Sequence, residues 1–209
     1  MRGTELPPFV SPMLAKRAVP FDSDDYLFEV KWDGARGTAL VGAGAYRLFS
    51  RHQVDITDCF PELAFLQKLP AGTVLDGEVV VLQHGKPDFS LLLSRLGTRG
   101  ELKTRVRART TPATYVAFDQ LYDDYNSMLR WPLWRRREQL AQTVRGVAER
   151  GLVFSDGVRA SGKALFREVA ERGLEGVVAK RLESRYVPGS RTDAWLKIKC
   201  DQGVSASRV

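Results

Sequence analysis

The amino-acid sequence predicts an α+β fold in which antiparallel sheets are flanked by helices. Segments with the composition of strands follow one another without an intervening helix, as at 26–31 and 37–51, whereas the clearest helical segments lie later, at 132–151 and 161–173. Strands and helices therefore do not alternate regularly, which argues against a βαβ array with a parallel sheet. A length of 209 residues suits one domain with a sizeable core.

The first half of the chain is predicted to consist mainly of strands. After an extended, proline-rich start, residues 26–31 form a strand, and 37–51 form a hairpin with its turn at 42–44. Residues 72–88 are rich in β-branched side chains and form either two strands or one strand and a turn. Between these segments Asp58 could cap a helix. The apolar face of that helix would consist of Phe60, Leu63, Leu66 and Leu69.

The second half is predicted to combine helices with short strands. Residues 88–97 carry apolar side chains at helical spacing, and 113–122 form a strand that leads into acidic residues. In the helix at 132–151, the three arginines 135–137 are expected to form the solvated face. Two short strands that carry lysines complete the chain, at 175–181 and 194–200.

The charge balance favours a polyanionic partner. Lysine and arginine outnumber aspartate and glutamate by 32 to 25, which gives a net charge of +7. Part of this surplus lies in "RGELKTRVRART" at 99–110, where cations at 103, 105, 107 and 109 would share one face if the segment were extended. Such a face could bind the DNA backbone, although an ordinary charged loop explains it equally well.

Cysteine, histidine and apolar content exclude several classes of protein. Two cysteines and two histidines in unrelated settings provide neither a disulfide framework nor a zinc cluster. The N-terminal segment lacks the apolar region of a secretion signal, and no apolar run is long enough to span a bilayer. We therefore expect no membrane association and a reducing, cytoplasmic location.

The stretch "EVKWDGAR" at 29–36 places a lysine where a buried strand should end. An amine is a strong nucleophile only when it is deprotonated, so a catalytic lysine needs nearby positive charge or desolvation to lower its pKa from about 10.4. Gly34 allows another backbone segment to pass closely, and Asp33 and Arg36 could orient the amine or a substrate. Taken alone, this stretch is also explained by a strand-end turn with solvated charges.

Other predicted strands present charged side chains in pairs. Asp76 and Glu78 in "LDGEVVVL" are two residues apart and so project from the same side of a strand. Lys197 and Lys199 in "AWLKIKC" share one face in the same way. Two lysines on one face suit a phosphate group, and two carboxylates suit a divalent metal.

Two more strand ends have a similar character. Phe118 lies beside Asp119 in "AFDQL", and Glu175 and Lys180 flank the apolar part of "LEGVVAKR". The aspartates of these motifs could equally be structural hydrogen-bond partners, namely Asp33, Asp76 and Asp119.

These motifs resemble, in their order along the chain, those of the covalent nucleotidyltransferases. They are "KWDGAR", "LDGEVV", "FDQL", "EGVVAK" and "WLKIK", with "SR" at 50–51 as a satellite of the first. Within that superfamily the chain is similar to the ATP-dependent DNA ligases, above all the bacterial repair and end-joining type. The resemblance extends from Pro12 to Lys199. It implies an ATP-grasp-like nucleotidyltransferase domain with the nucleotide in a groove between antiparallel sheets.

The resemblance also implies a role for each motif residue. Lys31 would attack the α-phosphate of ATP, form lysyl-AMP and release pyrophosphate. Glu29 would contact the adenine edge, and Phe118 would stack on its face. Glu78 would bind the ribose hydroxyl or the metal, and Glu175 would help to hold that metal, Mg²⁺ or Mn²⁺. The remaining cations would bind ribose or phosphate (Arg36, Arg51) or neutralise the α-phosphate (Lys197, Lys199, with Arg191 as a further candidate).

By the same resemblance, AMP would pass from Lys31 to a 5′-phosphate of nicked or broken double-stranded DNA, and a 3′-hydroxyl would then displace it. The chain would act as a monomer in DNA repair. RNA ligases and mRNA-capping guanylyltransferases share KxDG and are the alternative within the superfamily, and a DNA-binding module without catalysis is the alternative outside it.

The sequence departs from the ligase pattern in two places. Ligases of this type usually continue past "WLKIK" into an OB-fold domain, whereas only "DQGVSASRV" follows here. We therefore expect an adenylation domain at 1–200 and a short tail at 201–209, with no OB-fold domain in the chain and a separate one as a possible partner. "HQVDIT" at 52–57 stands where "NGxDxT" is expected, which leaves His52 as a surface side chain without an assigned role.

Overall fold

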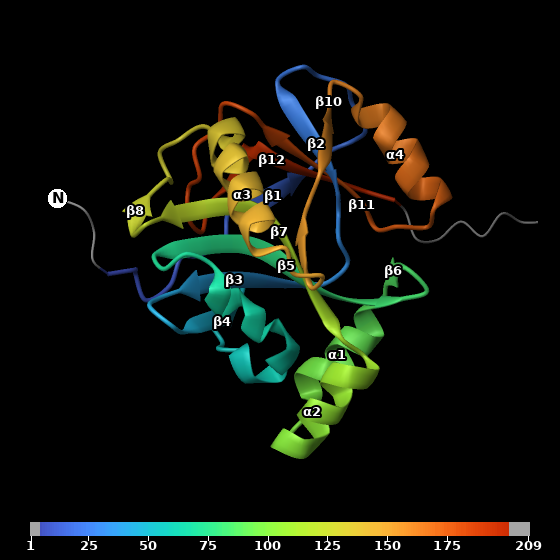
Figure 1. Ribbon diagram of the computed structural model, residues 1–209. Helices are drawn as coiled ribbons and strands as arrows, with labels where there is room; N and C mark the ends of the chain where they lie inside the picture. The colour runs from blue at the N-terminus through green and yellow to red at the C-terminus, as the bar shows by residue number, and fades with distance from the viewer. Residues whose placement is uncertain (1–4, 201–209) are drawn as a thin grey trace, which may run out of the picture.

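The computed structural model describes residues 5–200 (Figure 1), so the tail expected at 201–209 lies outside the described residues. The architecture within that range is α+β, as predicted, and consists of two β-sheets with helices packed on them. Most strand pairs are antiparallel, but two are parallel, β1 with β12 and β7 with β9. Both sheets thus contain one pair that the predicted antiparallel pattern did not include.

The first sheet has five strands in the order β1-β12-β11-β2-β10. Its strands are β1 (Leu14–Arg17), β2 (Tyr26–Val30), β10 (Gly157–Arg159), β11 (Gly176–Arg181) and β12 (Arg191–Lys199). Tyr26 and Phe28 of β2 pack with apolar residues of β11, β12 and helix α4 (Gly162–Glu171). β2 therefore lies deep in the sheet and ends at Val30, one residue before Lys31.

The second sheet has seven strands, with a main path β4-β3-β5-β7-β8 and with β6 beside β5 and β9 beside β7. Its strands are β3 (Ala35–Val41), β4 (Tyr46–Ser50), β5 (Thr73–Gln83), β6 (Lys86–Pro87), β7 (Ala113–Asp123), β8 (Asn126–Ser127) and β9 (Leu152–Phe154). The predicted hairpin at 37–51 is confirmed as β3 and β4, with Gly42 N donating to Ala45 O at 2.9 Å in the turn. The segment 72–88 forms two strands, β5 and β6.

The helices cover these sheets and contribute side chains to two of the three hydrophobic cores. Helix α3 (Leu133–Val147) packs against β7 and β9, and α1 (Phe89–Gly97) packs against β5. One core lies under these helices, a second surrounds Phe118 and Trp195, and a third lies beneath α4. The second core contains residues of both sheets, so it fixes how the sheets face each other.

The helix expected after Asp58 is a 3₁₀ segment. It consists of η1 (Thr57–Cys59) and η2 (Pro61–Lys68), and η2 begins after Phe60 without a side-chain cap, so the predicted role of Asp58 is wrong. The predicted apolar face is correct, because its four residues are at most 3% exposed. These residues recur at intervals of three, and a 3₁₀ helix has three residues per turn. The interval therefore favoured the tighter helix.

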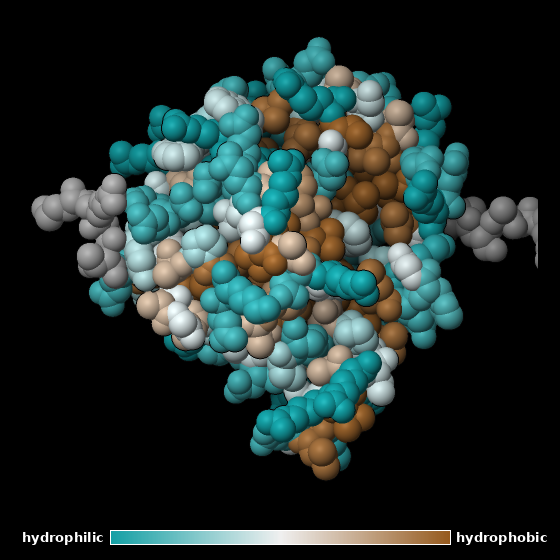
Figure 2. Space-filling view, viewed as in Figure 1, coloured by the Kyte–Doolittle hydropathy of each residue, from teal (hydrophilic) through white to brown (hydrophobic). Residues whose placement is uncertain are grey.

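The basic segment at 99–110 is helical, so it forms neither the extended cationic face nor the ordinary loop that the sequence left open. It forms α2 (Glu101–Thr110), which begins after Gly100 at φ 90°. Arg105 pairs with Glu101 at i, i+4, and Arg95 donates to the carbonyls of Arg107 and Thr111 at the end of the helix. Figure 2 shows hydrophilic and hydrophobic surface side by side over α2, whose exposed apolar residues are Leu102 and Val106.

The arginine run of α3 is buried in part, contrary to the prediction of a solvated face. Arg135 is exposed, and its guanidinium lies 4.0 Å from the Trp131 ring centroid. Arg136 is 0% exposed and binds Asp119 through two hydrogen bonds of 2.8 Å. Arg137 is also buried and reaches β2. Paired carboxylates allow guanidinium groups to be buried, and a periodicity argument does not include such partners.

Candidate active site

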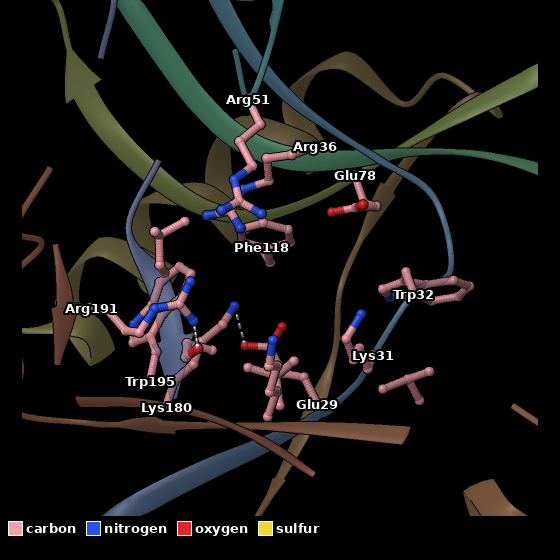
Figure 3. Close-up of a pocket in the computed structure, with 15 residues that line it drawn as sticks. Glu29, Lys31, Trp32, Arg36, Arg51, Glu78, Phe118, Lys180, Arg191 and Trp195 are labelled. Atoms are coloured by element: carbon pink, nitrogen blue, oxygen red, sulfur yellow. Dashed lines mark hydrogen bonds and ion pairs between the residues drawn. The ribbon is translucent and has the colours of Figure 1, made fainter. Parts of the chain in front are cut away.

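A pocket of about 250 Å³ opens where the two sheets meet (Figure 3). Strands β1, β2, β11 and β12 of the first sheet form one wall, and β3, β5 and β7 form the other. Eight of the predicted site residues line it: Glu29, Lys31, Arg36, Arg51, Glu78, Phe118, Arg191 and Lys197. The other two, Glu175 and Lys199, lie beside the pocket and connect to it through Lys31.

Lys31 lies at the end of β2, where its backbone N donates to Gly176 O at 2.8 Å. Its Nζ lies 2.6 Å from Glu175 Oε2, and Lys199 Nζ lies 2.9 Å from Glu175 Oε1. One carboxylate therefore bridges two of the predicted amines. Burial raises the pKa of Asp33, and the charge of Glu175 raises it further, while the charges of Lys31 and Lys199 oppose the shift.

Glu29 is 2% exposed and accepts three polar contacts. Its Oε1 lies 3.0 Å from both Arg137 Nη1 and Lys180 Nζ, and its Oε2 accepts a hydrogen bond of 2.8 Å from Ser155 Oγ. A carboxylate has about four lone-pair positions. The Glu29 carboxylate, which lines the pocket beside Lys180, is therefore held by three side chains.

Lys180 was not assigned a role from the sequence, although it lines the pocket and is 2% exposed. Its Nζ lies 4.1 Å from the Phe118 ring centroid. Burial lowers the pKa of Lys180, while the charge of Glu29 opposes that shift. The available signal was alternation within β11, because Val178 and Lys180 share a face and both line the pocket.

Two tryptophans that also line the pocket were missed by the sequence analysis. Trp32 follows Lys31, and its Nε1 lies 3.4 Å from Ser155 Oγ. Trp195 packs edge-on against Phe118, with ring centroids 5.9 Å apart. Trp32 lies inside the motif "KWDGAR" and Trp195 inside "WLKIK", so these two motifs were the available signal.

Arg36 is held by a buried carboxylate on β5. Asp76 is 0% exposed and receives Arg36 Nε at 2.5 Å, Arg36 Nη2 at 2.6 Å and Tyr186 Oη at 2.6 Å. The guanidinium carbon then lies 4.7 Å from the Phe118 ring centroid. Asp76 therefore acts as a structural partner of Arg36, which was one of the two alternatives that the sequence left open. Asp119 has the same relation to Arg136.

Glu78 lies on the same face of β5 as Asp76, as predicted, and pairs across the sheet with Arg36 of β3. Burial raises the pKa of Glu78 to about 7, although the charges of Arg36 and Lys31 oppose the shift. Gly34 makes this placement possible, because a Cβ on it would lie 2.3 Å from Val79 O and 2.8 Å from Glu78 Cγ.

A cationic rim completes the pocket. Arg51 follows β4, and Arg191 and Lys197 project from β12. Arg191 donates a hydrogen bond to Ala15 O. Burial lowers the pKa of Lys197, and the charges of Arg191, Lys199, Lys31 and Arg51 lower it further. Several positive charges therefore converge on one space, which suits a polyphosphate.

The predicted metal ligands fit a divalent ion only together with further oxygens. Among the described residues, no group of three or more His, Cys, Asp and Glu side chains could hold a metal. Glu78 and Glu175 are close enough that the charge of Glu175 raises the pKa of Glu78. Mg²⁺ usually takes one or two carboxylates together with substrate phosphates and water, and this donor set agrees with that pattern.

The comparisons agree with this geometry. A family model described as the ATP dependent DNA ligase domain matches residues 12–199. The SPbeta prophage-derived DNA ligase-like protein LigB of Bacillus subtilis is 34% identical over 192 residues, which cover 91% of this chain and 67% of LigB. No helix within residues 5–200 is long and apolar enough to cross a membrane.

Two solved structures are similar in fold and sequence. The ligase domain of LigD from Mycobacterium tuberculosis has a TM-score of 0.77 and 34% identity. Mycobacterial DNA ligase D complexed with ATP and MES has a TM-score of 0.74 and 35% identity. Each likeness covers 91% of this chain and 60% of the solved chain, so this chain spans under two thirds of their length. The predicted fold class is confirmed, and the chain belongs to the ATP-dependent DNA ligase domain family.

Proposed function

We propose that this chain is the adenylation domain of an ATP-dependent DNA ligase and that Lys31 carries AMP. The observation that carries the proposal is the position of Lys31, whose amine lies at the mouth of a cation-rimmed pocket and contacts Glu175 at 2.6 Å. In the first step the Lys31 nitrogen attacks the α-phosphorus of ATP and loses a proton. A P–N bond forms, the bond to the leaving oxygen breaks, and pyrophosphate departs.

The pocket walls suit one face and the edge of a nucleobase. Phe118 offers a ring for stacking, and Glu29 and Lys180 offer an acceptor and a donor for the base edge. Arg36, held by Asp76, and Arg51 are in reach of the ribose or the phosphates. These assignments give a role to each predicted residue on the base and ribose side of the pocket.

The phosphate side combines the remaining cations with the metal. Lys197, Lys199 and Arg191 would neutralise charge that builds up on the α-phosphate during attack. Glu175 and Glu78 would hold Mg²⁺ or Mn²⁺ together with phosphate oxygens, and the metal would polarise the phosphate. When the Glu175 carboxylate turned from Lys31 to the metal, it would also free the Lys31 amine for attack, because the same carboxylate contacts the amine and would bind the metal.

In the second half of the reaction, AMP would pass to a 5′-phosphate of nicked or broken double-stranded DNA, and a 3′-hydroxyl would displace it. The LigD relatives are named for non-homologous end joining, which supports a role in repair of breaks. We propose residues 1–200 as the catalytic unit, acting as a monomer in the cytoplasm.

Intact mass of the purified protein before and after incubation with ATP and Mg²⁺ tests the first step. The wild type should gain one AMP, and Lys31→Ala should gain none. Lys68→Ala is the matched control, because Lys68 lies on the surface and its ion-pair partner within residues 5–200 is Glu149, and it should gain AMP as the wild type does. Labelling that persists in Lys31→Ala would refute the assignment of the nucleophile.

Nicked DNA that already carries AMP on its 5′-phosphate tests the last step. A ligase domain should seal this substrate without ATP, whereas a DNA-binding module cannot. Protein that neither takes up AMP nor seals the pre-adenylated nick would contradict the proposal. GTP used in preference to ATP would instead favour a capping-type enzyme.

A further inference from the structure

We propose that Arg137 is a positioning residue that determines nucleotide specificity, because it holds the Glu29–Lys180 pair in the order that selects adenine over guanine. The inference rests on the proposed function and deepens it. Arg137 does not line the pocket, and the arginine run in which it lies was predicted to be solvated. Its burial therefore calls for an explanation beyond surface charge.

Arg137 connects both walls of the pocket from behind. Its Nη1 donates to Glu29 Oε1 and to Phe118 O, both at 3.0 Å, and its Nη2 donates to Ser155 O at 2.6 Å. Glu29 belongs to β2 of the first sheet, and Phe118 belongs to β7 of the second. The donors of a guanidinium lie in one rigid plane. A single side chain thus sets where the base-edge acceptor stands relative to the base-stacking ring.

The Glu29 carboxylate has little freedom to turn. One oxygen receives Arg137 and Lys180, and the other receives Ser155 Oγ. Rotation of the carboxylate would break contacts on both oxygens inside a buried space, and buried polar groups are costly to leave unpaired. Lys180 is fixed in turn through Glu29 (Figure 3).

Lys180 retains donors that the protein does not use. It is 2% exposed and lines the pocket, and its Nζ has an ion-pair partner in Glu29 but no hydrogen-bond partner among the described residues. An ammonium group has three N–H bonds. An unsatisfied buried donor in a pocket points to an acceptor on the ligand.

A donor beside an acceptor does not by itself distinguish the two purines. Adenine presents a donor at N6 beside an acceptor at N1, and guanine presents an acceptor at O6 beside a donor at N1. A carboxylate and an ammonium that could exchange places would bind either base. Discrimination therefore requires that their order relative to the Phe118 ring be fixed, and Arg137 bonds to Glu29 and to Phe118 at once.

The test measures dissociation constants of ATP and GTP, with Mg²⁺, by calorimetry on the whole chain. Lys31→Met is used as the parent so that no covalent transfer occurs. Arg137→Lys keeps the charge but loses the planar fork. We expect the ratio of the GTP constant to the ATP constant to fall about tenfold or more, the size expected when paired hydrogen-bond recognition is relaxed.

Arg136→Lys is the matched control. Arg136 precedes Arg137 in α3, is 0% exposed and binds Asp119, and it does not line the pocket. This variant should lose stability yet keep the parental ratio. Ser155→Ala provides a second variant, which removes the contact to the other Glu29 oxygen together with the longer contact of Trp32 Nε1 at 3.4 Å, and it should lower the ratio by a smaller factor.

The inference would be overturned if Arg137→Lys and Ser155→Ala both kept the parental ratio of the GTP to the ATP dissociation constant. Arg137 would then be structural only. A parent that binds ATP and GTP equally would also overturn it. Neither result affects the proposed function, which AMP labelling of the wild type decides separately. A parent that binds neither nucleotide, together with a wild type that takes up no AMP, would overturn both.

Discussion

The carboxylate of Glu175 bridges Lys31 and Lys199, with its two oxygens 2.6 Å and 2.9 Å from the respective Nζ atoms. Lys31 directly follows β2 of the first sheet, Glu175 precedes β11 and Lys199 ends β12. The pairing of β2 with β11, and of β11 with β12, brings the three groups together. Sheet register therefore assembles the charges on which the proposed activation of Lys31 depends.

Glu175→Gln should slow AMP transfer to Lys31 by about 10- to 100-fold or more, because it removes a proposed metal ligand and the partner of two amines. The measurement is the initial rate of AMP–protein formation over a range of Mg²⁺ concentrations. Glu168→Gln is the control, since Glu168 is an exposed acid of α4 that pairs with Arg172. A rate unchanged in Glu175→Gln would remove this residue from the mechanism.

Asp76→Asn should destabilise the fold by about 3–5 kcal/mol, because it leaves the guanidinium of Arg36 without its buried carboxylate. Urea unfolding of the nucleotide-free protein measures the change. Asp193→Asn, which breaks the exposed pair of Asp193 with Lys16, should change stability by less than about 1 kcal/mol. Equal effects of the two substitutions would show that burial of the Arg36 pair has no energetic consequence.

The sequence predicted those parts of the site that depend on local geometry. Asp76 and Glu78 share a face because β5 is extended, and Lys31 lies at a strand end because its apolar run stops at Val30. Motif order then indicated which strand ends belong together. The structure places eight of the ten predicted residues on one pocket and the other two beside it.

Partners that are distant along the chain could not be predicted in this way. Arg137 lies 108 residues from Glu29, and only the packing of α3 behind both sheets shows that its charge is neutralised. Lys180 was recognised as a strand-end lysine, but its approach to Phe118 depends on how the two sheets face each other. Periodicity describes one element at a time, whereas these contacts belong to pairs of elements.

The titration of Glu78 predicts a pH dependence of stability. Burial raises its pKa from an ordinary value of 4.5 to about 7, so the folded protein retains a proton that the unfolded chain releases above pH 4.5. Stability from this group is therefore full below pH 4.5 and is lost as the pH rises through about 7.

The free energy of unfolding of Glu78→Gln, relative to that of the wild type, should rise by on the order of 1–3 kcal/mol between about pH 4.5 and pH 8. Urea unfolding in EDTA without nucleotide measures this difference. A difference between the two proteins that stays constant across this range would contradict the raised pKa.

Gly34→Ala should abolish AMP labelling and destabilise the fold. A Cβ at this position would lie 2.3 Å from Val79 O and 2.8 Å from Glu78 Cγ, so β5 and the turn after Lys31 would have to separate. That separation moves Lys31 away from Glu78, and small displacements of a nucleophile cost large factors in rate.

Gly146→Ala is the control: nothing lies within 4 Å of its Cβ position in α3, so it should stabilise the helix by about 0.5–1 kcal/mol and leave labelling unchanged. Labelling by Gly34→Ala at the wild-type rate would show that the turn tolerates a side chain, and that the close approach of β5 to Lys31 is not required for transfer.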